Sequence, residues 1–170
     1  MHNHNQTMIV DLRDRSPSST TQSDDDVQLR APTRSDIPGI GQLYFDSYES
    51  GLSGESVEEA TTDIEASWDG DYGEFWEEGS VVAELNGKIV GALLTVKQAP
   101  WEQTPSGPFI IELFVGSDLR GRGIARRLME RGLDTMRSQG AMSVGLRVLT
   151  GNTRAQNFYR SLGFSDWTPT

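Results

Sequence analysis

The sequence has 170 residues, contains no cysteine and carries a formal net charge of −10. This length suits one domain with a hydrophobic core, and the absence of cysteine excludes a thiol nucleophile and predicts a cytoplasmic protein. The acidic balance argues against binding to nucleic acid. No apolar run is long enough for a membrane span, and the beginning of the chain lacks the charged and apolar regions of an export signal.

The two histidines, His2 and His4, lie in a polar stretch at the start of the chain. We therefore expect no metal site and no histidine general base, and acid–base chemistry falls to Asp, Glu, Tyr or water. Residues 1–26 are rich in Ser, Thr and Asp, and we interpret them as a disordered tail. Residues 27–170 are then expected to form the folded domain.

The first expected elements are a strand over 27–31 and a helix from Ile37 to Tyr48, which Gly51 to Gly54 would end. A second helix is predicted from Ser56 to Trp68, because Ser56 with Glu59 three residues later forms a capping-box pattern.

A hairpin follows, since Asn86-Gly87 separates two apolar runs, 80–85 and 88–96. Residues 98–108 contain Trp101 and three prolines and are expected to form a loop. Trp101 either packs on the surface or lines a substrate pocket.

The centre of the chain combines an apolar strand over 109–115 with a helix that begins near Ile124 and ends before Gly140. Gly121 and Gly123 lie at the helix start among four arginines. Such a start offers backbone N–H groups and a partial positive charge, which suits a phosphate or pyrophosphate. The alternative is a glycine-rich turn with solvated arginines.

A strand over 143–149 and a helix over 152–161 complete the pattern, with Gly163 after the helix. The last strand must be short, over about 164–168, or else another subunit completes the edge of the sheet. The second alternative would make the protein a homodimer.

Two segments carry a resemblance to a known family. Arg120-x-x-Gly123-x-Ala125 is similar to the R/Q-x-x-G-x-G/A acyl-CoA signature of the GNAT superfamily of N-acetyltransferases, and residues 152–164 resemble its N-x-x-A-x-x-F-Y-x-x-L-G-F segment. The resemblance covers about residues 27–167. It implies an α/β fold, a single domain in which a mixed, mostly antiparallel central sheet is flanked by helices.

The resemblance also implies roles for individual residues. Backbone N–H groups of Leu113, Phe114 and Val115 would contact the thioester and pantetheine of acetyl-CoA, the expected co-substrate. Asn152 would contact the cofactor arm or only cap its helix. The other expected cofactor-binding residues, which include the pyrophosphate turn, are Arg120, Gly121, Arg122, Gly123, Ile124, Ala125, Arg126, Ala155 and Phe158.

Tyr159 matches the tyrosine of the second segment, which implies a general acid; alternatively, it is a core tyrosine with a satisfied hydroxyl. Glu112 is the one ionisable residue in the strand over 109–115. Desolvation there would raise the pKa of its carboxyl and make it a candidate general base. The alternatives are a structural ion pair with Arg147, or a chain of water molecules as the base.

The resemblance therefore implies an N-acetyltransferase that acts without an acyl-enzyme intermediate. A non-catalytic acyl-CoA sensor or regulatory module, or a transferase of another acyl group, remains the alternative. Residues 35–87 hold fourteen acidic and no basic residues. This either provides solubility or favours a cationic acceptor, a small-molecule or peptide amine. In the second case, the aromatic rings of this segment would face the acceptor beside the carboxylates, namely those of Tyr48, Trp68, Tyr72 and Trp76.

Overall fold

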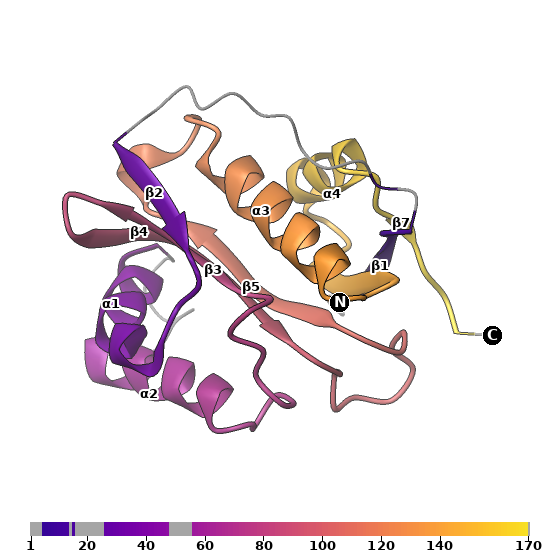
Figure 1. Ribbon diagram of the computed structural model, residues 1–170, viewed down its shortest axis with the longest axis horizontal. Coiled ribbons are helices and arrows are strands. Elements are labelled where there is room, and N and C mark those ends of the chain that lie inside the picture. Colours follow the sequence, from indigo (N-terminus) through magenta and orange to yellow (C-terminus); the bar gives the residue numbers. More distant parts are fainter. Residues whose placement is uncertain (1–4, 14, 16–25, 48–55, 170) are drawn as a thin grey trace.

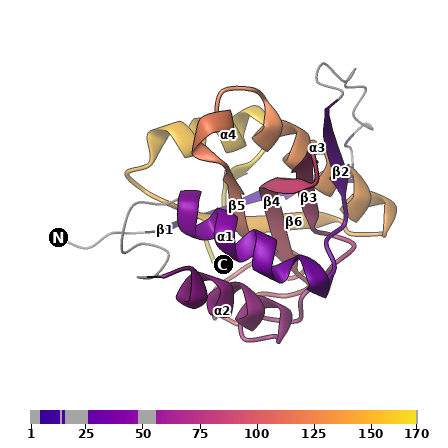
Figure 2. The same cartoon turned by 90° about the vertical axis from the view of Figure 1, so that its left-hand side faces the viewer.

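The computed structural model describes residues 5–13, 15, 26–47 and 56–169. They form one mixed sheet in the order β2-β3-β4-β5-β6-β1-β7, with α1 and α2 on one face and α3 and α4 on the other (Figures 1 and 2). The predicted fold class is confirmed. The strands are β1 (Asn5–Asp11), β2 (Val27–Arg30), β3 (Val81–Leu85), β4 (Lys88–Val96), β5 (Phe109–Val115), β6 (Ser143–Leu149) and β7 (Ser165–Asp166), and the helices are α1 (Ile37–Ser47), α2 (Val57–Trp68), α3 (Ile124–Ser138) and α4 (Thr153–Ser161).

Local sequence signals account for most of these elements. Asn86 and Gly87 have φ values of 53° and 79°, the left-handed pair that a type I′ hairpin turn requires. Ser56 caps α2 by accepting a hydrogen bond from the Glu59 N–H at 3.1 Å. The expected helix break at Gly51 to Gly54, the end of the first helix at Tyr48, and His2 and His4 lie outside the described residues.

The prediction of a disordered tail is wrong for Asn5–Asp11. This stretch is strand β1, which pairs antiparallel with β6 along its whole length, from Asn5 opposite Leu149 to Asp11 opposite Ser143. The physical reason is that every second residue is apolar and points into the core: Met8, Val10 and the following Leu12 are buried.

Strand β1 also completes the sheet beside β6. The last strand, β7, has two residues and pairs with Met8 and Ile9 of β1. The short last strand is thus confirmed, and the place beside β6 is filled by an N-terminal strand of the same chain.

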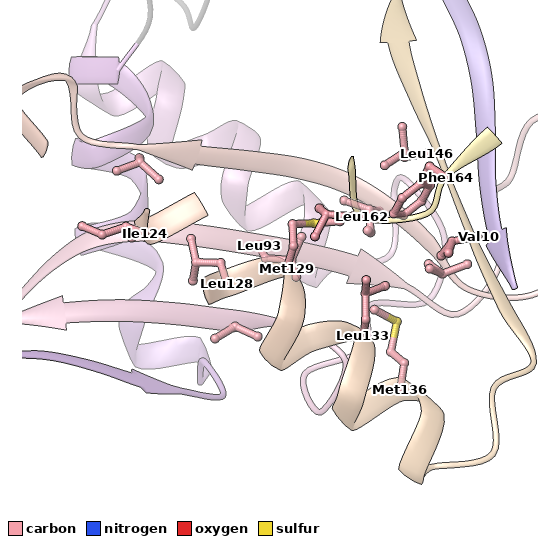
Figure 3. Close-up of a cluster of buried hydrophobic side chains, with 14 of the residues drawn as sticks. Val10, Leu93, Ile124, Leu128, Met129, Leu133, Met136, Leu146, Leu162 and Phe164 are labelled. Carbon is pink, nitrogen blue, oxygen red and sulfur yellow. The ribbon is translucent and has the colours of Figure 1, made fainter. Parts of the chain in front are cut away.

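Helix α3 packs its apolar side on the sheet, and its first turn lies at the end of β5. Leu128, Met129, Leu133 and Met136 are fully buried against Leu93 and neighbouring core residues (Figure 3). A second cluster lies under α1 and α2 on the other face of the sheet. The two clusters pack on opposite faces of the sheet whose strands form the site described below.

Within the described ranges, no helix combines the length and apolar character that a membrane span needs. The same residues contain no group of three or more His, Cys, Asp or Glu side chains placed to hold a metal ion.

Candidate active site

Strands β5 and β6 diverge at the centre of the sheet. They are parallel, and their pairing joins Phe109 to Gly145 and Ile110 to Leu146. A cavity of about 690 Å³ opens beyond these pairs. Its walls come from β5, β6, the turn between β5 and α3, and α4.

Most of the residues expected to bind the cofactor or to act in catalysis line this one cavity. Arg122 is the exception. The cavity wall includes Glu112, Leu113, Phe114, Val115, Arg120, Gly121, Gly123, Ile124, Ala125, Arg126, Asn152, Ala155, Phe158 and Tyr159. The two sequence segments that carry the family resemblance therefore meet in space, at the opening between β5 and β6.

A bulge in β5 determines where Glu112 points. Leu94 pairs with Glu112 and Thr95 with Ile110, so Ile111 is the additional residue. The Thr95 N–H instead donates to Ser80 Oγ at 2.9 Å. Because Leu94 and Ile111 belong to clusters on the α1 and α2 side, Glu112 faces that side as well.

The start of α3 is built from glycines in the left-handed region. Gly121 has φ 83° and Gly123, the residue before the helix, has φ 78°. Gly123, at the N-cap position, has no side chain that could cap the helix, and a Cβ at either glycine would meet open space. The first N–H groups of a helix have no partner within it, so this turn presents donors and a partial positive charge to the cavity.

The arginines around this turn bind neighbouring elements of the fold. Arg120 donates to the Ser47 carbonyl at the end of α1 (2.7 Å), and Arg127 donates to the Val27 carbonyl (3.1 Å). Arg126 donates to Ser161 Oγ at 2.5 Å and lies over the Phe158 ring. These three side chains brace the turn against α1, β2 and α4.

Tyr159 lies on α4, half-buried against the core, with its ring near those of Phe158 and Phe164. Burial, and after it the charge of Glu112, raises the pKa of Tyr159 to about 12. Asn152 accepts a hydrogen bond from the Ala155 N–H at 3.1 Å and so caps α4. This is the capping role that the sequence suggested.

Arg147 does not form the structural ion pair with Glu112 that the sequence left open. Within the described part of the chain, its guanidinium lies over the Trp101 ring, 5.1 Å from the ring centre. Trp101 also contacts Phe109 edge-on and is 40% exposed. Arg147 lines the cavity, which brings a cation and Glu112 into the same site.

Sequence reasoning missed a polar pair on the α2 side. The Tyr72 hydroxyl donates to Asp63 at 2.6 Å. This hydrogen bond, followed by burial and by the charges of Asp63, Asp71 and Glu112, raises the pKa of Tyr72 to about 12. The acidic composition of this segment was the available signal, but no local pattern pairs these two residues.

Two of the aromatic residues expected to face an acceptor pack elsewhere. The Trp68 ring packs against the Phe75 ring at a tilt of 31°, with ring centres 4.1 Å apart, and Trp68 Nε1–H donates to Glu77 at 2.9 Å. Trp76 packs against the core cluster under α3. Tyr48 lies outside the described residues.

Solved structures share this fold. A GCN5-related N-acetyltransferase from Sphaerobacter thermophilus matches 96% of this chain and 48% of its own, with a TM-score of 0.72 and 20% sequence identity. The aminoglycoside N-acetyltransferase AAC(6')-Iy in complex with CoA matches 85% of this chain and 90% of its own, with a TM-score of 0.63 and 19% identity.

Sequence comparison identifies the family. N-alpha-acetyltransferase 30 of Schizosaccharomyces pombe is 36% identical over 89 residues, which is 52% of this chain and 59% of that protein. The matches to two further curated relatives cover 43% and 31% of the length of those proteins. The model of the acetyltransferase (GNAT) family matches residues 38–164. A match over this much of the chain shows that the protein belongs to the GNAT family of acetyltransferases.

Proposed function

We propose that this protein transfers an acetyl group from acetyl-CoA directly to a primary amine on a cationic acceptor. One observation carries the proposal: the glycine turn, Glu112 and Tyr159 line a single cavity where β5 and β6 diverge. The glycine turn offers backbone N–H donors at one end of the wall, and the Glu112 carboxyl and the Tyr159 hydroxyl lie near the strand opening. This arrangement suits an elongated anionic co-substrate whose reactive end reaches the sheet.

The turn at Gly121 and Gly123 is the proposed pyrophosphate site. Both glycines leave open space where a side chain would stand, so a ligand can approach the backbone closely. Backbone N–H groups of Leu113, Phe114 and Val115 would hold the pantetheine and the thioester carbonyl, where negative charge develops during acyl transfer.

The proposed reaction forms a bond between the amine nitrogen and the acetyl carbon and breaks the bond between that carbon and sulfur. Glu112 accepts the proton that the amine loses, directly or through water. Tyr159 donates a hydrogen bond or a proton to the departing thiolate. Once protonated, Glu112 carries no charge, so one of the two causes that raise the pKa of Tyr159 disappears at this step. Tyr159 thus becomes a stronger acid when the thiolate leaves.

The proposed preference for a cationic acceptor rests on the charges around the α2 side. Asp63, Asp71 and Glu112 all act on the Tyr72 hydroxyl, so several carboxylates surround one region beside the cavity. The carboxylates would attract an ammonium group to this region. Other carboxylates of the acidic segment are engaged within the fold, among them Asp69 with Arg34 and Glu74 with Lys97.

The experiment that tests this function is a thiol-release assay with acetyl-CoA against a panel of amines. The panel contains a polyamine, an aminosugar, lysine, a peptide with a free N-terminus, and neutral and anionic amines. Propionyl-CoA and succinyl-CoA replace acetyl-CoA in parallel. Cationic amines should give the highest kcat/KM, with acetyl-CoA as the best donor. CoA binding without thiol release from any amine would instead identify a sensor.

The dependence of KM on salt concentration tests whether the acceptor is bound through its positive charge. Exposed charges are screened beyond about 8 Å at physiological ionic strength, so KM for the acceptor should rise with salt. KM for acetyl-CoA should change less because backbone groups hold it. A best substrate that is neutral or anionic, or an acceptor KM that ignores salt, would contradict the cationic preference and leave the acetyl transfer itself intact.

A further inference from the structure

Arg147 and Trp101 form a cationic and aromatic corner of the cavity wall. The guanidinium lies 5.1 Å from the centre of the indole ring, within the range of a cation–π contact. Within the described part of the chain, Arg147 contacts this ring and forms no ion pair with a carboxylate. An exposed guanidinium that lines a cavity without an acidic partner can bind an anion.

The loop that carries Trp101 is fixed against β6. Gln98 Oε1 accepts a hydrogen bond from the Gly107 N–H at 2.8 Å, and the Thr104 hydroxyl donates to the Trp101 carbonyl at 2.9 Å. A Cβ at Gly145 would lie 3.1 Å from Phe109, so the glycine lets the loop end lie close to the strand. The Trp101 ring is therefore held in position by its loop, and the Arg147 guanidinium packs on it.

Arg147 and Glu112 face the same side of the sheet. Leu146 and Val148 belong to the core cluster under α3, so Arg147 between them points to the opposite face. Glu112 pairs with Leu94, which packs under α1 and α2 on that face. The opening between the two strands thus has a carboxylate on one wall and a guanidinium on the other.

We propose that Arg147, supported by Trp101, binds a carboxylate of the acceptor, and that the acceptor is a basic amino acid. Its reacting ammonium would lie near Glu112, its carboxylate near Arg147, and its second ammonium toward the acidic α2 side. A guanidinium binds a carboxylate through two parallel hydrogen bonds, which fixes orientation as well as position. This inference rests on the proposed acetyl transfer to a cationic amine and adds the anionic group that the acceptor must carry.

The test compares lysine with cadaverine, which has the same two amines and lacks the carboxylate. The unmodified protein should acetylate lysine with the higher kcat/KM. Arg147→Gln should lower kcat/KM for lysine by about 10- to 100-fold, the effect of losing hydrogen bonds to a charged group, and should lower it much less for cadaverine. Arg147→Lys should restore only part of the preference, because an ammonium cannot form the paired hydrogen bonds.

Arg131→Gln is the matched control. Arg131 is exposed on α3 and lines neither the cavity between β5 and β6 nor the one beside α1 and the β3–β4 turn, yet its replacement changes the net charge by the same amount. It should leave the ratio of lysine to cadaverine activity unchanged. Equal activity on both amines in the unmodified protein, or an equal loss with both in Arg147→Gln, would overturn the carboxylate site.

Calorimetry distinguishes this failure from a failure of the proposed function. If no amine supports thiol release, lysine and cadaverine are titrated into the protein with CoA present. Binding of lysine that is lost in Arg147→Gln, with cadaverine binding weaker than lysine binding, supports the site without any catalysis. No difference between the two ligands overturns it.

Discussion

Tyr159 and Glu112 lie in two walls of one cavity, close enough for the carboxylate charge to act on the tyrosine hydroxyl. Burial and this charge together raise the pKa of Tyr159 to about 12, so the hydroxyl keeps its proton at neutral pH. A thiol has a pKa of about 8.5, and each pKa unit corresponds to about 1.4 kcal/mol. Full proton transfer to the thiolate is thus unfavourable while Glu112 is charged and becomes easier once Glu112 has taken a proton from the amine.

Tyr159→Phe tests the role of the hydroxyl directly. The change preserves the ring contacts with Phe158 and Phe164, so affinity for acetyl-CoA measured by calorimetry should remain. The kcat should fall by about 10²- to 10⁴-fold, the range for a proton-transfer group. Turnover within a factor of about two of the unmodified protein would show that the tyrosine serves only the core.

Glu112→Gln tests the coupling between the two residues. It removes the second cause of the raised pKa and leaves burial, so the pKa of Tyr159 should move from about 12 toward its ordinary value of 10. Tyrosinate absorbance during alkaline titration, with Tyr159→Phe subtracted, measures this value. An unchanged pKa would mean that the two groups do not interact in solution.

The same pKa predicts how stability depends on alkaline pH. Because the pKa of Tyr159 is raised above its unfolded value of 10, its contribution to stability is present below about pH 10 and is lost as the pH rises toward 12. Urea unfolding of the unmodified protein should show this decline. Tyr159→Phe should show a smaller decline, and the part that remains includes Tyr72, whose pKa is also raised to about 12.

Gly123→Asp tests the anion site. Most side chains are strained at φ 78°, where Asn and Asp are tolerated best, so an aspartate there mainly adds bulk and a negative charge beside the proposed phosphate site. Gly123→Asn is the matched control, since asparagine has the same shape and tolerates the left-handed region. Calorimetry should show acetyl-CoA binding abolished in the aspartate variant and weakened less in the asparagine variant. Equal affinity of a folded Gly123→Asp protein and the unmodified one would remove this turn from the site.

Met8→Ala tests the N-terminal strand. Met8 is fully buried in the core, so the change should lower the free energy of unfolding by about 2–5 kcal/mol. Asn5→Ala, at an exposed position of the same strand, should change it by less than about 0.5 kcal/mol. Equal, small effects of the two changes would show that β1 contributes nothing to stability.

The sequence by itself determined the elements whose causes are local. Apolar periodicity, the capping serine of α2, the Asn86-Gly87 turn and the glycines before α3 each act over a few residues, and two motif segments identified the family. Nearly all of the expected site residues then met in one cavity, because those segments flank the strands that diverge.

Only the tertiary structure decided which distant segments meet. Nothing in the order of residues placed Asn5–Asp11 beside β6 or laid Arg147 over Trp101, since both contacts join parts of the chain far apart in sequence. Likewise, the bulge that directs Glu112 arises from pairing between β4 and β5. Strand register and side-chain packing depend on the whole sheet being assembled, because each strand finds its partners through burial and backbone hydrogen bonds that no single segment can form alone.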